Sequence, residues 1–96
     1  MIFAWDESKN RANRRKHRVS FEAAVRVFED PRAVSYVERV VDGEERWHTI
    51  GSAGAIAILL IVHTVEEQNG EENVRIISAR KAAPGERALY YSHASP

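Results

Sequence analysis

The chain has 96 residues, 44% of them hydrophobic and 29% charged, which is typical of a globular protein, so we expect one domain spanning residues 1–96. It has no cysteine, which excludes a disulfide framework and a thiolate metal site and agrees with a reducing cytoplasm. Its start has no signal-peptide pattern, and its longest apolar run, Ala55–Val62, is too short to span a bilayer. We therefore expect a cytoplasmic protein that does not associate with a membrane.

The formal net charge is zero, but the charges are unevenly distributed. Residues 1–18 carry six Lys and Arg against two acids, and residues 75–96 carry four against one. Residues 19–74 carry four against eleven. Two basic ends on an acidic body can form a positive face if the fold brings them together, and local potential matters more for nucleic-acid binding than net charge. The alternative is that these are ordinary solvated helix faces.

The N-terminal quarter predicts a short strand and a polar helix. Residues 2–5 read as a strand, and Asp6 is a good N-cap for the segment 7–17. This segment has good helix formers but almost no apolar face, and Ala12 is its one small apolar residue. A helix that is polar all round is exposed, marginal or faces a polar partner. Because this one is also strongly basic, a polyanion is one candidate partner.

A second helix is predicted from an apolar stripe. Ser20 can cap it, and it ends at Asp30-Pro31, because a residue before proline is disfavoured in the helical region. The spacing i, i+3, i+4, i+7 indicates an amphipathic helix whose buried side chains are Phe21, Ala24, Val25 and Phe28.

The next two segments predict a β-hairpin. Val34–Val41 and Glu45–Ile50 are strand-like and meet at Asp42-Gly43, a strong turn signal. A two-residue loop would place Arg39 opposite Arg46, which is unfavourable. We therefore expect a three-residue loop with Arg39 opposite Trp47, followed by a turn at residues 51–54.

The C-terminal half predicts two further strands and a helix. Ala55–Val62 is a continuous apolar run, typical of a strand covered on both faces, and Val74–Arg80 follows a polar loop, Glu66–Asn73. Pro84 fits the first turn of a last helix whose apolar side is Leu89–Tyr91. The predicted fold is α+β in the order β-α-α-β-β-β-β-α, with two N-terminal helices packed on a largely antiparallel sheet and a C-terminal helix after it.

Several short blocks along the chain then resemble one known family. They are Phe3-x-Trp5-Asp6-Glu7-x-Lys9-x-x-x-Asn13-x-x-Lys16-His17-x-Val19-Ser20-Phe21-Glu22-x-Ala24, Val27-Phe28-x-Asp30-Pro31, Gly43-Glu44-x-Arg46-x-x-x-Ile50-Gly51, His63-Thr64, and Arg75-Ile76-Ile77-Ser78-Ala79-Arg80-Lys81-Ala82 with Glu86 and Tyr90. In this order and in a chain of this length, they resemble the BrnT family of toxins from end to end.

The resemblance implies a RelE-like fold and a ribonuclease activity that inhibits translation and arrests growth. It also implies neutralisation by a BrnA-like antitoxin, whose ribbon-helix-helix part binds operator DNA. Toxin and antitoxin of this kind usually form a heterotetramer, so contact with operator DNA is expected only through the antitoxin.

The chemistry of RNA cleavage indicates which residues to examine. With no metal-ligand cluster in the sequence, we expect no cofactor, and the substrate's own 2′-hydroxyl is the expected nucleophile. A base then removes its proton, a cation stabilises the charged phosphorane and an acid protonates the leaving oxygen. Arg80 and Lys81 are the leading cations, because they end a strand where a side chain can project over the sheet edge. Arg75 alternates with Arg80, so we expect at most one of the two to face a given layer.

The candidate proton carriers are Glu86, Tyr90 and His17. Glu86 is also what the helix dipole favours in a first turn, and His17 can be a helix C-terminal cation. Of the adjacent Tyr90 and Tyr91, we expect one to pack inward and the other to be available for stacking or donation. His63 closes the buried strand, and His48 and His93 have no supporting context.

A further set of cations is expected to hold the RNA backbone or to bind an acidic antitoxin segment: Lys9, Arg11, Arg14, Arg15, Lys16 and Arg46. An alternative function is a catalytically weak relative that pairs with the antitoxin in operon autoregulation. Two departures from the family pattern favour it, because Val65-Glu66-Glu67 and residues 83–87 have lost positive charge. Direct DNA binding is disfavoured because no helix-turn-helix or ribbon-helix-helix pattern is present.

Overall fold

The elements of the chain follow the predicted order. The computed structural model describes residues 1–54 and 57–94. Along the chain these residues form β1 (Ile2–Ala4), α1 (Glu7–His17), α2 (Phe21–Val25), a 3₁₀ helix η1 (Arg26–Glu29), β2 (Val34–Val41), β3 (Glu44–Ser52), β4 (Ile58–Gln68), β5 (Glu71–Lys81) and α3 (Pro84–Ala94). The α+β class and the order β-α-α-β-β-β-β-α are therefore confirmed, and none of the described helices is long and apolar enough to cross a membrane.

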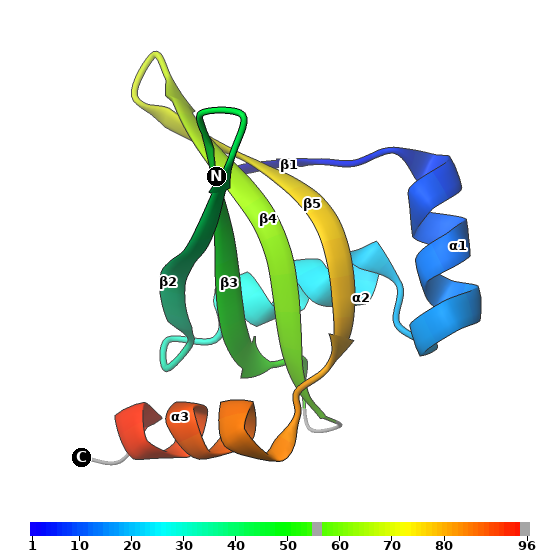
Figure 1. The fold of residues 1–96 in the computed structure, drawn as a ribbon, viewed down its shortest axis with the longest axis vertical. Coiled ribbons are helices and arrows are strands. Elements are labelled where there is room, and N and C mark those ends of the chain that lie inside the picture. The colour runs from blue at the N-terminus through cyan, green and yellow to red at the C-terminus, as the bar shows by residue number, and fades with distance from the viewer. Residues whose placement is uncertain (55–56, 95–96) are drawn as a thin grey trace.

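The strands form one five-stranded sheet in the order β1-β5-β4-β3-β2. β1 pairs in parallel with β5, and every other neighbouring pair is antiparallel. Figure 1 shows α2 crossing behind this sheet, α3 lying across its lower end and α1 standing beside β5. The expected central position of the apolar strand is confirmed for β4, with β5 beside it. The predicted strand also includes Ala55 and Ile56, which lie outside the described residues.

The expected polar loop between β4 and β5 was wrong. The two strands continue pairing as far as Gln68 and Glu71, and they meet in a tight turn at Asn69 and Gly70. Both turn residues have positive φ, 52° and 77°, as a two-residue hairpin turn requires. The acidic stretch is exposed as expected, but an exposed hairpin arm needs no apolar residues when its backbone is paired.

The expected three-residue loop between β2 and β3 was also wrong. Val41 pairs with Glu44, so the loop is Asp42-Gly43, with φ values of 50° and 79°. Arg39 therefore lies opposite Arg46, and the register shifts between Val37 and Arg39. Neighbouring carboxylates offset the repulsion, since Glu38 pairs with Arg39 at 2.6 Å and Glu44 with Arg46 at 3.5 Å. The preference of Asp42-Gly43 for a two-residue turn therefore outweighs the cost of placing Arg39 opposite Arg46.

The main core lies between α2, η1 and one face of the sheet. Ser20 caps α2 by accepting a hydrogen bond from the Ala23 N–H at 3.0 Å. Phe21 and Ala24 are fully buried, which at about 2 kcal/mol for an aromatic side chain makes Phe21 a principal anchor. Of the predicted stripe, Phe21 and Ala24 are buried, and Val25 and Phe28 pack half-buried against the same core. The helix tightens to a 3₁₀ helix after Val25, which also buries Val27.

Helix α1 is attached through two buried amides rather than an apolar stripe. Asn10 accepts from the Phe21 N–H at 2.9 Å and donates to Glu22 at 2.8 Å. Asn13 donates to the carbonyls of Val19 and Ala79, each at 2.8 Å, and accepts from the Ala79 N–H at 3.2 Å. Asn13 thus provides hydrogen-bond partners for the N–H and carbonyl of Ala79, on the edge of β5 beyond the point where β1 stops pairing with it.

Helix α3 covers one end of the opposite face of the sheet. Its Tyr90 packs in a second cluster with Ile50, Leu60 and Ala82, and the Tyr90 hydroxyl donates to Asp30 at 2.7 Å. Tyr91 is 57% exposed, so the expectation that one of the two adjacent tyrosines packs inward is confirmed. The rest of this face carries no helix in Figure 1, and we call it the open face.

Candidate active site

A β-bulge places Arg75 and Arg80 on the same face of β5. Val62 pairs with Ser78 but His63 pairs with Ile76, so Ile77 has no partner on β4. Arg80 lies opposite Leu60, which packs on the α3 side, and Arg75 lies opposite Thr64 on the same side. The expectation that at most one of the two arginines faces a given layer was therefore wrong. Strict alternation fails because a bulge inserts one residue into one strand only.

The pair of Arg80 and Glu86 occupies the end of the open face next to α3. The two guanidinium nitrogens of Arg80 donate to the two oxygens of Glu86 at 2.8 and 2.9 Å. These hydrogen bonds lower the pKa of Glu86 and raise the pKa of Arg80. Glu86 also accepts from the Ala83 N–H at 2.7 Å, so it caps the start of α3 from within. The carboxylate therefore both holds Arg80 in place and anchors α3.

A histidine and a tyrosine lie on the same face, across β2 and β3. The Tyr36 hydroxyl and the Nδ1 atom of His48 are 3.2 Å apart. Burial lowers the pKa of His48, and it raises the pKa of Tyr36, with the charge of Glu86 adding to that increase. His48 is therefore neutral near pH 7 and Tyr36 keeps its proton. Neither residue is among those predicted from the sequence, although the alternation of His48 with Arg46 along one strand is a usable signal.

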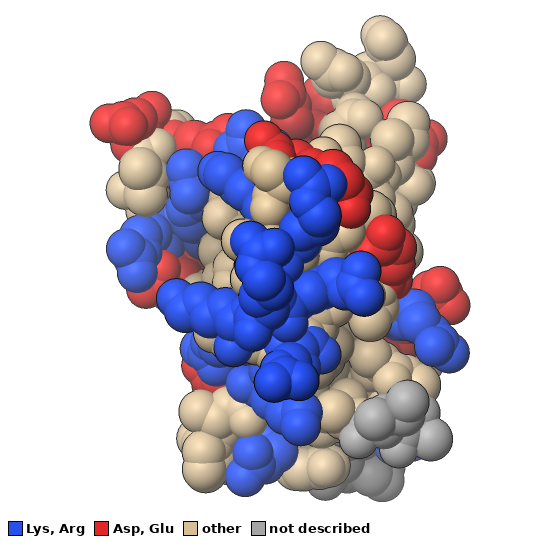
Figure 2. All heavy atoms as spheres, turned by 90° about the vertical axis from the view of Figure 1, so that its right-hand side faces the viewer, with Lys and Arg blue, Asp and Glu red and all other residues tan. Residues whose placement is uncertain are grey.

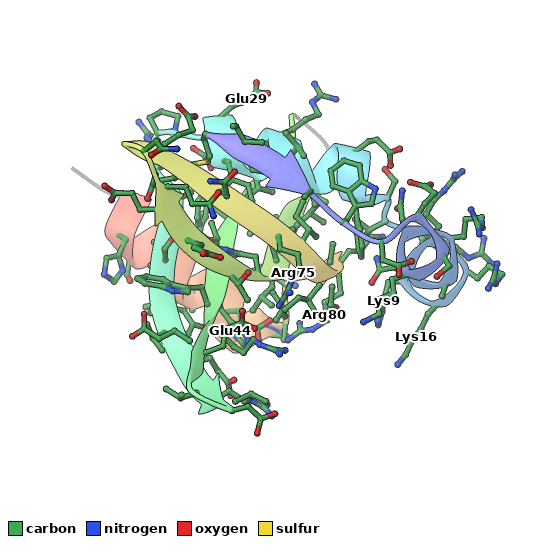
Figure 3. The ribbon with its side chains drawn as sticks, turned by 90° about the horizontal axis from the view of Figure 1, so that it is seen from above. Lys9, Lys16, Glu29, Glu44, Arg75 and Arg80 are labelled. Carbon is green, nitrogen blue, oxygen red and sulfur yellow. The ribbon has the colours of Figure 1, made fainter. Side chains whose placement is uncertain are left out.

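The other end of the open face holds Arg46, Arg75 and Glu44. Arg75 donates to Glu44 at 2.8 Å, and Arg46 lies 3.5 Å from the same carboxylate oxygen. Within the described residues, the Nε atom of Arg46 is buried without a hydrogen-bond partner. Figure 3 shows Glu44, Arg75 and Arg80 together on this side of the sheet. The open face thus carries three arginines, the carboxylates of Glu44 and Glu86 that pair with them, and the His48–Tyr36 pair.

The other predicted catalytic residues lie elsewhere. His17 ends α1, beside the edge of the sheet. Tyr90 is 6% exposed and its hydroxyl is bound to Asp30 in the core. Lys81 lies opposite Leu59, on the face that α2 covers, because it alternates with Arg80. The fold therefore places Arg75, Arg80 and Glu86 on one face of the sheet, with Arg75 at one end and the Arg80–Glu86 pair at the other. Lys81 lies on the opposite face and His17 at the sheet edge, whereas Tyr90 is on the same side as Arg80 but buried under α3.

The basic residues of α1 form a continuous surface beside the open face. Figure 2 shows Lys and Arg gathered over the side of the molecule on which α1 lies. Lys9 and Lys16 project to the same side of the sheet as Arg75 and Arg80 (Figure 3). A shallow hollow on the outer side of the helix is lined by Arg11, Arg14, Arg15 and Arg18. A polyanion on the open face would therefore continue onto Lys9 and Lys16.

Comparisons with known proteins found one matching family and one similar fold. The sequence model of a family described as the ribonuclease toxin BrnT of type II toxin–antitoxin systems matches residues 5–86. No curated protein sequence matches this chain. The fold is similar to the crystal structure of the ribonuclease toxin BrnT from Brucella abortus, with a TM-score of 0.59 and 21% identity, covering 86% of this chain and 99% of that one. Since the family match spans most of the sequence, the chain belongs to the BrnT family of ribonuclease toxins of type II toxin–antitoxin systems.

Proposed function

We propose that the open face binds single-stranded RNA and cleaves it with the substrate's own 2′-hydroxyl as nucleophile. The observation that carries this proposal is the forked Arg80–Glu86 pair lying on one face with His48 and Tyr36. Because Glu86 holds the edge of the Arg80 guanidinium between its two terminal nitrogens, the edge formed by Nε and one terminal nitrogen is the one that would contact two phosphate oxygens at once, which a lysine cannot do. The proposed reaction uses only side chains of the chain and needs no metal ion.

The proton transfers are assigned to two groups whose pKa directions keep His48 neutral and Tyr36 protonated near pH 7. Neutral His48 accepts the 2′-hydroxyl proton while the 2′-oxygen attacks the adjacent phosphorus. Arg80 stabilises the phosphorane, and the bond to the 5′-oxygen breaks as Tyr36 supplies that oxygen with a proton. The products are a 2′,3′-cyclic phosphate and a 5′-hydroxyl. Glu86, whose pKa the Arg80 hydrogen bonds lower, is a weak base and holds Arg80 in position.

The remaining cations hold the RNA backbone. Arg46 and Arg75 lie on the open face, and Lys9 and Lys16 extend its positive field past the edge of β5. Contacts of this kind position the strand without reading its sequence and weaken as salt increases.

Substitution of Arg80 tests the catalytic assignment. Arg80→Ala is expected to reduce the rate of RNA cleavage on the order of a hundredfold, because it removes the main stabiliser of the developing charge. Arg80→Lys restores only part of the rate. Arg32→Ala, at an exposed arginine in the loop before β2, is the matched control and keeps the full rate. Full cleavage by folded Arg80→Ala would remove Arg80 from the site.

The pH dependence tests the base. Cleavage by the parent chain is expected to rise with pH through the range in which His48 loses its proton, which lies below pH 6.5 because burial lowers its pKa. His48→Gln should abolish this rise and lower the rate at neutral pH. An unchanged profile in His48→Gln would assign the base to another group.

We also propose the partner and the setting of this activity. The partner is a BrnA-like ribbon-helix-helix antitoxin that forms a heterotetramer with this chain in the cytoplasm. Within this complex, only the antitoxin contacts operator DNA. Cleavage of RNA in the absence of the antitoxin inhibits translation and arrests growth. Co-expression with the antitoxin gene of the same operon tests it, since growth arrest should be relieved and the two proteins should purify together.

A second candidate function is a catalytically weak relative that acts mainly by pairing with the antitoxin. Its supporting observation is the acidic arm of the β4–β5 hairpin, which exposes Glu66, Glu67 and Glu72 and carries a half-buried Glu71. Expression of the chain alone decides between the two functions. Growth arrest that Arg80→Ala removes supports the enzyme, whereas normal growth with retained antitoxin binding supports the binding module.

A further inference from the structure

A second surface, separate from the open face, is a groove beside α1 and α2. Its volume is about 550 Å³. Four cations surround it, from α1, the ends of both helices and the end of β5: Arg14, Arg18, Arg26 and Lys81. Its floor includes the apolar side chains of Val19, Ala23 and Leu59. The groove therefore combines a positive rim with an apolar base.

The groove and the open face lie on opposite sides of the sheet. Lys81 lies opposite Leu59, which belongs to the core under α2, whereas Arg80 lies opposite Leu60, which packs under α3. Adjacent residues of β5 therefore serve two different surfaces. A ligand in the groove leaves Arg80, His48 and Tyr36 accessible.

The chemistry of the groove favours a protein over RNA. None of the described side chains that line it is aromatic, whereas unpaired bases are held mainly by stacking on aromatic rings. Apolar side chains flanked by carboxylates would instead place their apolar atoms on the floor and their charges against the four cations.

The walls of the groove are held in fixed positions before anything binds. Asn10 joins α1 to α2 through the Phe21 N–H and the Glu22 carboxylate, at 2.9 and 2.8 Å. Asn13 joins α1 to the Val19 carbonyl at 2.8 Å. A surface that is already ordered loses little conformational entropy on binding, which favours high affinity.

We propose that this groove is the docking surface for an acidic segment of a partner protein that carries small apolar side chains between its carboxylates. In the proposed function this partner is the antitoxin, so the inference rests on that assignment and specifies its binding surface. The antitoxin would then be held on the side of the sheet that faces away from the catalytic residues.

Charge-reversal variants test the groove by titration calorimetry with the purified antitoxin of the same operon. Arg14→Glu and Arg26→Glu are each expected to raise the Kd by on the order of tenfold or more, because each places a carboxylate against the acidic segment. Arg15→Glu is the matched control: it makes the same charge change on α1 but does not line the groove, so its Kd stays within about twofold of the parent value. Ala23→Gln, which adds bulk without charge, should also raise the Kd.

Cleavage of single-stranded RNA by the same variants separates the inference from the proposed function. Arg26→Glu and Ala23→Gln should cleave RNA at the parent rate, whereas Arg80→Ala should lose cleavage and keep its antitoxin affinity. The docking surface would be overturned if Arg14→Glu and Arg26→Glu both bound the antitoxin with the parent Kd, or if Arg15→Glu lost as much affinity as they do. Loss of cleavage in the groove variants would make the groove an RNA surface instead. A parent chain that cleaves RNA but does not bind the antitoxin would overturn the inference and leave the ribonuclease assignment standing.

Discussion

His63 is a buried histidine whose surroundings indicate a structural role. It is 2% exposed, its ring packs edge-on against Phe28 with centroids 5.0 Å apart, and its Nε2 atom lies 2.7 Å from the Thr49 hydroxyl. That hydroxyl lies 2.7 Å from the hydroxyl of Ser35, so a polar chain crosses three strands inside the core. Burial lowers the pKa of His63 to about 4. The family block His63-Thr64 therefore includes a neutral core residue on the face opposite the proposed active site.

This burial predicts an acid-dependent loss of stability. A histidine whose pKa is lower in the folded chain contributes its full stability above pH 6.5, and the contribution is lost as the pH falls toward 4. The loss should reach about 3 kcal/mol in the free energy of unfolding, measured by urea denaturation across this range. His63→Gln should be less stable at pH 7 but should lose the part of the pH dependence that His63 contributes. An equally steep dependence in that variant would assign it to other groups.

Gly51 is required for close packing rather than for backbone freedom. A Cβ atom there would lie 2.9 Å from the Val27 Cγ1 atom and 3.1 Å from the Ala33 Cβ atom. Gly51→Ala should therefore lower the free energy of unfolding by about 1–3 kcal/mol, because the residues after α2 must move away from β3. Gly85→Ala is the matched control, since nothing lies within 4 Å of that position in the first turn of α3. Its stability should be unchanged or higher by up to about 1 kcal/mol.

At the scale of elements, the position of α1 depends on amide hydrogen bonds. Asp6 is the N-cap of the helix and stabilises its first turn, because its side chain accepts from the N–H groups of Ser8 and Lys9 at 2.8 and 3.2 Å. Its buried residues, however, are Asn10 and Asn13, so little apolar burial fixes it to the sheet. Hydrogen bonds alone give an attachment that a single substitution can release.

Asn13→Ala should detach α1 without unfolding the sheet. The change leaves the N–H and carbonyl of Ala79 and the carbonyl of Val19 without their partner, which should cost about 2–3 kcal/mol. Hydrogen exchange of the α1 amides and of Ala79 should accelerate, while the β3 and β4 amides stay protected. In the control Asn73→Ala, which loses only a long contact of 3.4 Å to the Glu71 carbonyl, exchange in α1 should not change. Parent-like protection of α1 in Asn13→Ala would contradict this account.

At the scale of the whole molecule, charge is separated although its sum is zero. Six of the fourteen basic residues lie in the first eighteen positions, and the fold gathers them on one side of the molecule (Figure 2). The acidic residues of the β4–β5 hairpin extend from the upper end of the sheet (Figure 1). The molecule therefore presents a strongly positive side to a polyanion.

This separation predicts retention on immobilised heparin at a pH where the net charge is zero or slightly negative. The combined change Arg11→Gln and Arg15→Gln should lower the salt concentration needed for elution, because it weakens the basic side. The control Arg32→Gln and Arg39→Gln removes the same charge from other parts of the chain and should elute close to the parent. Equal shifts in both double variants would show that net charge, not its location, governs binding.

Local patterns were sufficient for the elements and the family. The stripe of Phe21 and Ala24 was enough to predict a buried helix, and the apolar run before His63 was enough to predict the central strand. Periodicity and run length depend only on residues close together in the chain. The ordered blocks around Lys16-His17 and residues 75–82 were sufficient to identify the family, as the match over residues 5–86 confirms. The basic helix was also evident, since its charge is a matter of composition.

The tertiary structure decided which side chains meet. The bulge at Ile77 placed Arg75 and Arg80 on the same face of β5, and the register of β2 with β3 placed Tyr36 beside His48. Both depend on a partner strand, and no pattern within one strand records where its partner inserts or omits a residue. Asn13 donates to the carbonyl of Ala79, 66 positions further along the chain. A polar side chain on a polar helix therefore attaches that helix to the sheet. The sequence by itself determined what each segment is, whereas the three-dimensional fold determined which residues share a surface, because that depends on distances between segments far apart in the chain.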